Sequence, residues 1–223
     1  MEKKFRTIKS YVLRAGRMSP AQQNAYDTHF EQFTLPFRDN YLTMEELYNG
    51  KKNVIIEIGF GMGDATHQIA QDNPDKSYIG IEVHRPGVGK LLYQIEQNNV
   101  QNLRIIEHDA VDVLDRMIPD DSISGFHIFF PDPWPKKKHH KRRLIQSEFV
   151  SRLEKKLKSG GYLYAVTDWE NYAEHIMDVL TESSLENRYK HYADSQDWRP
   201  GTNFERKGRE KLHSIFEMMF IKK

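Results

Sequence analysis

Short apolar runs alternate with longer segments of helical periodicity from about residue 51 onward. Runs rich in β-branched and aromatic residues predict strands at 54–59, 77–83, 103–108, 124–130 and 162–167. The stretches between them repeat apolar residues at helical spacing and predict helices at 64–72, 86–97, 111–117 and 142–158. This alternation predicts an α/β fold in which a mostly parallel sheet is covered by helices on both faces.

The pattern changes toward the C-terminus. Gly160 and Gly161 follow the helix at 142–158, and we expect them to end it with a left-handed cap. After a helix at 171–183, two strands are expected at 188–193 and 213–222, with no helix between them. Neighbouring strands that lack a crossover helix run antiparallel, so the sequence predicts an antiparallel C-terminal edge.

Residues 1–50 differ from the rest of the chain. Residues 1–19 hold six Lys or Arg residues against one acid, Glu2, and the following residues show no firm periodicity. We therefore interpret 1–50 as a basic, partly mobile extension and 51–223 as the folded domain. The basic residues between 3 and 17 offer a second surface for a polyanion.

Composition excludes several classes of protein. The chain has 223 residues and no cysteine, which rules out a disulfide scaffold, thiolate metal sites and a cysteine nucleophile. No apolar run approaches the length of a membrane helix, and the basic start lacks the apolar stretch of a signal peptide. We therefore expect a soluble, cytoplasmic protein without membrane contact, although the net charge of +1 says little about its partners.

An acidic residue stands at the end of each of the first five predicted strands. These residues are Glu57, Glu82, Asp109, Asp132 and Asp168. A single acid there is commonly a cap for the next helix. Because ligands of open α/β sheets bind at the carboxyl ends of the strands, we expect the five acids to converge on one crevice.

The first strand leads into a glycine-rich turn, EIGFGMG at 57–63. A dinucleotide-binding fingerprint places its third glycine three residues after the second, but Asp64 occupies that position. This weakens the case for a nicotinamide dinucleotide as the cofactor. An acid two residues before G-x-G-x-G resembles the first motif of S-adenosylmethionine (SAM) methyltransferases. We expect Gly59 and Gly61 to admit the cofactor closely. The alternative is a tight turn without a ligand.

The next two acids suit an adenosine pocket. Glu82 is placed to accept hydrogen bonds from a ribose diol. Asp109 is placed to accept one from an adenine amino group, or to cap the helix that follows.

The segment after the fourth strand reads FPDPWPKKKHHKRR at 130–143. Proline restricts both its own φ and the residue before it, so Asp132 is held in a narrow set of conformations. Six of the eight positions 136–143 are Lys or Arg and the others are His139 and His140. Such a run is either a solvated face or a phosphate-binding surface, and its place beside the crevice favours phosphate. Adjacent histidines seldom bind one ion, and we expect no metal.

At these motifs the chain resembles the bacterial tRNA (guanine-N7)-methyltransferases, class I SAM-dependent enzymes with a Rossmann-like sheet. The resemblance covers nearly the whole chain and is most specific at PDPWPK, 131–136. It implies SAM contacts at Glu57, Glu82, Asp109 and Asp132, with Asp132 also catalytic. It implies RNA contacts at Lys136, Lys138, His139, His140, Lys141, Arg142, Arg143, Asp168, Thr202, Asn203, Phe204 and Glu205. Many relatives carry Lys at the position of Asn203.

The implied reaction is methylation of N7 of a guanine in the variable loop of tRNA. Guanine N7 has a lone pair and no proton at neutral pH, so alignment matters more than a general base. Asp132 then either stabilises the growing positive charge or orients the guanine. The residues leave open whether the protein is a monomer or a homodimer.

Two other functions compete with this interpretation. An amino-group methyltransferase acting on adenine or cytosine carries Asp/Asn-Pro-Pro-aromatic after the same strand, whereas here Trp134 follows Pro133 directly. A non-catalytic RNA-binding protein on the same fold would use the basic run, but it leaves the strand-end acids unexplained.

Overall fold

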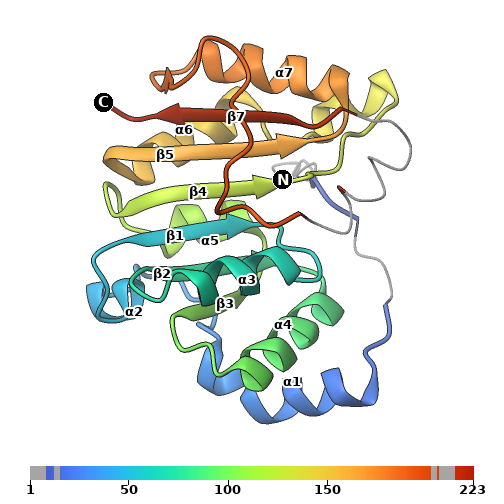
Figure 1. The fold of residues 1–223 in the computed structure, drawn as a ribbon, viewed down its shortest axis with the longest axis vertical. Helices are drawn as coiled ribbons and strands as arrows, with labels where there is room; N and C mark the ends of the chain where they lie inside the picture. Colours follow the sequence, from blue (N-terminus) through green and yellow to red (C-terminus); the bar gives the residue numbers. More distant parts are fainter. Residues whose placement is uncertain (1–8, 13–15, 202–204, 206–213) are drawn as a thin grey trace, which may run out of the picture.

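The computed structural model describes residues 9–12, 16–201, 205 and 214–223. A seven-stranded sheet forms the centre of this described part, in the order β3-β2-β1-β4-β5-β7-β6 (Figure 1). Its strands are β1 Val54–Ile58, β2 Ser77–Glu82, β3 Leu103–Glu107, β4 Ile123–Phe129, β5 Leu157–Thr167, β6 Glu186–Asn187 and β7 Phe216–Ile221. Strands β1 to β5 are parallel, and β7 is antiparallel to β5 and β6, which confirms the predicted fold class.

Helices cover both faces of the sheet (Figure 1). They are α1 Pro20–Phe33, α2 Met44–Tyr48, α3 Asp64–Asp72, α4 Arg85–Asn98, α5 Ala110–Arg116, α6 Ser147–Lys156 and α7 Glu170–Thr181. Alternate residues of a strand point to opposite faces, so Ile55 joins the core under α1, α3 and α4. Ile56 joins the core under α5, α6 and α7.

The N-terminal region contains two helices that the sequence pattern does not predict. Helix α1 begins with a capping box between Ser19 and Gln22, and it packs with α4 through buried Ala25 and Phe33. Because these are the only buried residues described for α1, its apolar face is too narrow to give a clear period. The division of the chain at residue 50 remains a prediction.

Two expected elements have different bounds. The helix predicted at 142–158 begins only at Ser147 and ends at Lys156, and β5 starts at once at Leu157. The predicted glycine cap is therefore wrong. Gly160, at φ 75°, lies inside β5, where the pairing register with β4 shifts. Gly161 packs closely, since a Cβ there would lie 2.8 Å from the Lys158 carbonyl oxygen.

The expected strand at 188–193 is also wrong. Among the described residues between α7 and β7, only Glu186–Asn187 pairs with β7 as a strand, and the described residues after it form an irregular segment. Two backbone hydrogen bonds still tie that segment to β7, from the Arg188 N–H to the Met219 carbonyl at 2.9 Å and from the Ala193 N–H to the Glu217 carbonyl at 2.6 Å. The predicted strand at 213–222 is observed from Phe216 to Ile221, and residue 213 lies outside the described residues.

Candidate active site

A cavity of about 700 Å³ opens at the carboxyl ends of the parallel strands. The strand order reverses between β1 and β4, and this is where open α/β sheets bind ligands. Glu57, Glu82, Asp109 and Asp132 line the cavity together with the glycine turn, including Gly59 and Gly61. Four of the five strand-end acids therefore meet in one crevice, but Asp168 is not among the lining residues.

The glycine turn depends on conformations and spacings that other residues do not tolerate. Gly59, Gly61 and Gly63 have φ values of 75°, 61° and 78°. A Cβ on Gly87, in the first turn of α4, would overlap with the carbonyl oxygen of Gly61. The turn and α4 are thus in direct contact, and no local sequence pattern marks Gly87 as part of this arrangement.

Glu57 lies at the end of β1 in the interior of the site, and its residue is only 4% exposed. Burial raises the pKa of its carboxyl group to about 8, and the negative charge of Glu82 contributes in the same direction. A buried carboxyl group with a raised pKa favours a cationic ligand group, because a positive charge would stabilise its ionised form.

Glu82 holds the glycine turn through its side chain. Its Oε2 accepts a hydrogen bond from the Gly61 N–H at 2.8 Å, and its Oε1 accepts from the N–H groups of Val83 and His84 at 2.6 and 2.9 Å. A carboxylate has about four lone-pair directions, so acceptor capacity remains for a ligand hydroxyl.

Asp109 has two roles in the structure. It caps α5 by accepting a hydrogen bond from the Val111 N–H at 2.9 Å, which confirms the helix cap that the sequence offered as an alternative to adenine binding. It also accepts one from Lys9 Nζ at 2.6 Å while lining the cavity. Burial alone would raise the pKa of Asp109, but the Lys9 ammonium and the Val111 N–H outweigh it and lower the pKa.

Asp132 sits at the rim of the cavity on a conformationally constrained elbow. Phe130 and Trp134, on either side of the Pro131-Asp132-Pro133 sequence, have φ values of 50° and 46°. Left-handed conformations at such bulky residues are uncommon and cost on the order of 1–2 kcal/mol each. The Phe130 N–H also donates to the Val166 carbonyl at 2.8 Å, which ties the elbow to β5. The backbone therefore fixes where the Asp132 carboxylate is presented.

A short N-terminal segment crosses the mouth of this site. Ser10, Tyr11 and Val12 line the cavity. Trp134 Nε1 donates to the Ser10 carbonyl at 3.0 Å, and Arg142 donates to the carbonyls of Lys9 and Tyr11 at 3.1 and 3.0 Å. Of the basic residues at 3–17, only Lys9 and Arg17 are described, and Lys9 binds Asp109 inside the site.

The basic run forms a 3₁₀ helix, η1, at Lys137–Arg142, which lies before α6 rather than within it. Lys136, Lys137, Lys138 and Lys141 are exposed, whereas His139, His140 and Arg142 are partly buried. The guanidinium of Arg142 lies 4.0 Å from the centre of the Trp134 ring. This surface borders the elbow that carries Asp132.

Arg143 differs from its neighbours because it is only 3% exposed. Its guanidinium donates to the Pro133 carbonyl at 3.0 Å and to the carbonyl and side-chain oxygens of Asn171 at 3.3 and 2.8 Å. It also lies over the Tyr172 ring, 4.7 Å from the centroid. In this arrangement Arg143 connects the elbow to α7 and presents little surface to a phosphate.

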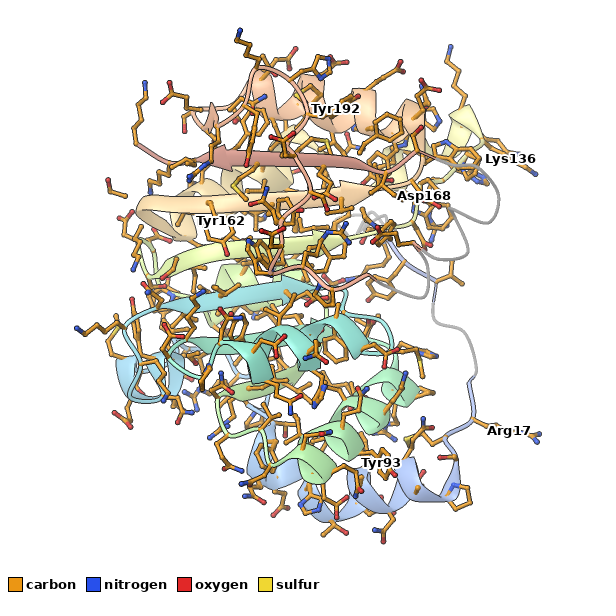
Figure 2. The ribbon with its side chains drawn as sticks, viewed as in Figure 1. Arg17, Tyr93, Lys136, Tyr162, Asp168 and Tyr192 are labelled. Carbon is orange, nitrogen blue, oxygen red and sulfur yellow. The ribbon has the colours of Figure 1, made fainter. Side chains whose placement is uncertain are left out.

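The remaining predicted RNA-contact residues come from the C-terminal half. Asp168 is partly buried just after β5, and Figure 2 shows it at the same edge of the sheet as Lys136. Thr202, Asn203 and Phe204 lie outside the described residues. Glu205 is described and is 4% exposed, with its Oε2 2.6 Å from Arg199 Nη1.

Comparisons with known proteins identify the family of this chain. Residues 51–218 match the protein family described as "Putative methyltransferase". The tRNA (guanine-N(7)-)-methyltransferase of Methylobacillus flagellatus is 50% identical, over 98% of this chain and 92% of the relative. This chain belongs to the tRNA (guanine-N(7)-)-methyltransferase family. The tRNA (guanine-N(7)-)-methyltransferase of Chromobacterium violaceum is 48% identical, over 98% of this chain and 97% of the relative.

Solved structures with low sequence identity share the fold of the family. The 16S rRNA methyltransferase KamB superposes with a TM-score of 0.61 at 12% identity, covering 86% of this chain and 99% of that one. A precorrin-6y C5,15-methyltransferase from Geobacter metallireducens gives a TM-score of 0.53 at 12% identity, covering 77% and 81%. These likenesses confirm the class I methyltransferase fold.

The family is SAM-dependent, and the described residues fit that cofactor. A backbone-only surface at Gly59 and Gly61 lets a ligand approach the turn, and the Glu57 carboxyl group lies deeper in the same cavity.

Among the described residues no group of three His, Cys, Asp or Glu side chains is placed to hold a metal ion. None of the helices in the described ranges is long and apolar enough to cross a membrane.

Proposed function

We propose that this protein transfers the methyl group of SAM to N7 of a guanine in the variable loop of tRNA. One observation carries this proposal. The constrained elbow that bears Asp132 lines the same cavity as Glu57, Glu82 and Asp109, while the exposed lysines of η1 begin a few residues beyond it. An acid-lined nucleoside pocket beside a basic surface suits a cationic donor and a polyanionic acceptor.

Each strand-end acid has a proposed role toward the cofactor. Glu57 pairs with the α-ammonium group, since its buried carboxyl group has the raised pKa that a cation would lower. Glu82 accepts from the ribose hydroxyls while keeping the glycine turn closed. Asp109 accepts from the adenine amino group at the far end of the cavity, next to Lys9.

Bound SAM supplies a methyl group on a positively charged sulfur. The lone pair of guanine N7 forms the new N–C bond as the C–S bond breaks, and the positive charge passes to the guanine ring. No proton leaves N7, so the protein needs no general base there. The fixed carboxylate of Asp132 stabilises the charge that develops on the ring, because a preorganised anion needs no reorganisation during the step.

The RNA is held outside the cavity, at the edge where Lys136 and Asp168 lie (Figure 2). The exposed lysines of η1 contact phosphates, and Asp168 accepts hydrogen bonds from the guanine. Arg143 supports the elbow through Pro133 and Asn171. We also propose that the protein acts in the cytoplasm, because its proposed substrate is tRNA. Residues 51–223 would then form the catalytic domain, and residues 1–50 an N-terminal extension.

Methyl transfer to bulk tRNA tests this proposal. The protein is incubated with SAM labelled in the methyl group and unmodified tRNA, and the RNA is then digested to nucleosides. We expect label in 7-methylguanosine, mapped to the variable loop by reduction and aniline cleavage. Label in N-methylated adenosine or cytidine would favour an amino-group methyltransferase. Calorimetry that shows no SAM binding would favour a non-catalytic RNA-binding protein.

A further inference from the structure

Four residues of the N-terminal region, 9–12, lie at the mouth of the cofactor cavity, and we call them the strap. Ser10, Tyr11 and Val12 line the cavity. No backbone–backbone hydrogen bond between described residues involves the strap, and Val12 is 54% exposed. The strap is therefore a wall of the cavity that belongs neither to a helix nor to the sheet.

One attachment of the strap is made by side chains that follow β4. Trp134 Nε1 donates to the Ser10 carbonyl at 3.0 Å. The Arg142 guanidinium donates to the carbonyls of Lys9 and Tyr11 at 3.1 and 3.0 Å. All three bonds are accepted by backbone carbonyls, so they hold the path of the strap itself and are lost if it moves away.

The other attachment is the side chain of Lys9. Its Nζ lies 2.6 Å from Asp109 Oδ2 and 4.0 Å from Asp112 Oδ2. The Lys9 side chain is 45% exposed, whereas that of Asp109 is only 10% exposed. Lys9 thus ties an exposed segment to a carboxylate in the cavity wall. Hydrogen bonds between charged groups are stronger than neutral ones, which makes this the strongest single link of the strap.

The closed strap leaves room for the cofactor. Asp109 accepts from the Val111 N–H on Oδ1 and from Lys9 on Oδ2. A carboxylate has about four acceptor directions, so the adenine amino group can bind Asp109 while Lys9 stays in place. With the strap in this position the cavity still measures about 700 Å³, which is within the range of pockets that enclose small ligands.

Opening the strap requires few contacts to break. Between described residues these are the three hydrogen bonds to strap carbonyls and the Lys9–Asp109 pair. Gly16, by contrast, is packed so closely against α4 that a Cβ there would lie 2.9 Å from the His84 ring and from Pro86. Segments that move to admit a ligand come from the least stable parts of a fold. The strap can therefore open while Gly16 keeps its packing against α4.

We infer that the strap closes over the adenosine end of the cavity and sets how fast SAM enters and its demethylated product, S-adenosylhomocysteine, leaves. Lys9 is the latch of this closure. The inference rests on the proposed role of Asp109 toward adenine, and it goes beyond that role in assigning the strap to cofactor exchange.

Surface plasmon resonance on the immobilised full-length protein tests the inference, with SAM and S-adenosylhomocysteine as probes. A latch that forms both with and without the cofactor slows entry and release together, so its loss raises both rates and changes Kd little. Lys9→Met is expected to raise the association and dissociation rate constants by about 10-fold each and to leave Kd within about 3-fold.

Trp134→Phe tests the other attachment. Phenylalanine keeps an aromatic ring beside the Arg142 guanidinium but lacks the Nε1 donor to the Ser10 carbonyl. Because Arg142 still holds the strap, both rate constants are expected to rise by a smaller factor, about 3-fold.

Lys222→Met is the matched control. Lys222 donates to Asp121 at 2.7 Å, and neither residue lines the cavity. Its two rate constants are expected to stay within about 2-fold of wild type. Thermal melting of every variant verifies that the proteins compared are folded.

Several outcomes would overturn the inference. Faster release with unchanged association in Lys9→Met would show that the strap only contacts the bound cofactor. Faster association with unchanged release would show that Lys9 competes with adenine for Asp109. Unchanged rates, or equal rises in Lys222→Met, would show that the strap controls no exchange.

Failure of the proposed function is a separate result. Wild type that binds SAM but transfers no methyl group to tRNA would refute N7 methylation, while the two rate constants would still decide the role of the strap. Wild type that binds neither probe would overturn both.

Discussion

The cofactor cavity and the RNA-facing edge are neighbours, but they are built in opposite ways. Glu57, Glu82 and Asp109 are each at most 9% exposed, and sheet, turn and capping hydrogen bonds hold them before any ligand arrives. The lysines of η1 are exposed on a short polar helix. A buried site gains selectivity from preorganised polar groups, whereas an exposed basic surface gains affinity from displaced counterions and carries little selectivity.

Asp132 stands where the two regions meet, and its removal has the largest expected effect. Asp132→Ala should lower single-turnover methyl transfer by roughly 10²–10³-fold, because the transition state loses a fixed anion. The Kd for SAM should stay within a few-fold. Asp132→Asn should be impaired nearly as much, because the amide keeps an acceptor but not the charge. Asp27→Asn, on the exposed surface of α1, is the control. Wild-type turnover in Asp132→Ala would remove Asp132 from the mechanism.

Neutralising the exposed lysines should affect the RNA-facing edge alone. In the variant with Lys137, Lys138 and Lys141 changed to Gln, the slope of log affinity for tRNA against log salt should become shallower by roughly 2–3 units. The Kd for SAM should not change. A charge-matched control replaces Lys52, Lys155 and Lys190, which are exposed elsewhere. Equal slopes in the two triple variants would mean that the η1 lysines form only a solvated face.

Glu57 should make SAM binding pH-dependent. With a pKa near 8 in the free protein, its carboxyl group is mostly protonated at pH 7, and pairing with an ammonium ion favours the ionised form. Calorimetry in buffers of different ionisation enthalpy should detect about one proton released per SAM bound at pH 7. Glu57→Gln should abolish this release and weaken binding by about 10-fold or more. Proton release that persists in Glu57→Gln would contradict this assignment.

Removing the Glu57 carboxyl group should weaken SAM binding but should stabilise the free protein at high pH. Because its folded-state pKa is raised, Glu57 stabilises the protein most at low pH, and that contribution is lost as pH rises toward about 8. Glu57→Gln should therefore raise the melting temperature of the free protein at pH 8 by about 2–4 °C for each kcal/mol of desolvation cost removed. An unchanged or lower melting temperature would contradict the raised pKa.

Arg143 should show the smallest effect on RNA binding. Because its guanidinium is buried against Pro133, Asn171 and Tyr172, Arg143→Gln should lower the melting temperature and leave the salt slope for tRNA unchanged. Lys138→Gln is the paired variant, with a shallower slope and an unchanged melting temperature. A shallower slope in Arg143→Gln would return Arg143 to the phosphate-binding set.

The sequence predicted the residues of the cofactor cavity better than those of the RNA-facing edge. The cavity residues are placed by local strand patterns, whereas the edge depends on contacts between residues that are distant in sequence. Buried strands have a strong local pattern, and an acid at a strand end is placed by that strand, so Glu57, Glu82, Asp109 and Asp132 were found. A run of cations has no period that could distinguish a 3₁₀ helix from an α-helix. The burial of Arg143 depends on Asn171, which is distant in sequence.

Other features depend on tertiary contacts that no local pattern shows. The local pattern around Gly160 predicts a helix cap, but its N–H donates to the carbonyl of Lys222, which is distant in sequence. Arg199, in the irregular segment after β6, donates to Glu217 of β7, which also accepts a hydrogen bond from Tyr164 of β5. Asp168 ends its strand like the other acids but lies outside the cavity, because the cavity centres on β1, β2 and β4.

The most direct test of the account is a tRNA transcript in which 7-deazaguanosine replaces guanosine. This substitution removes the N7 lone pair and leaves the phosphates, the Watson–Crick edges and all adenine and cytosine amino groups unchanged. We predict that the 7-deaza transcript binds with the same salt dependence as the normal transcript and accepts no methyl group. Methyl incorporation at the rate of the normal transcript would contradict N7 transfer.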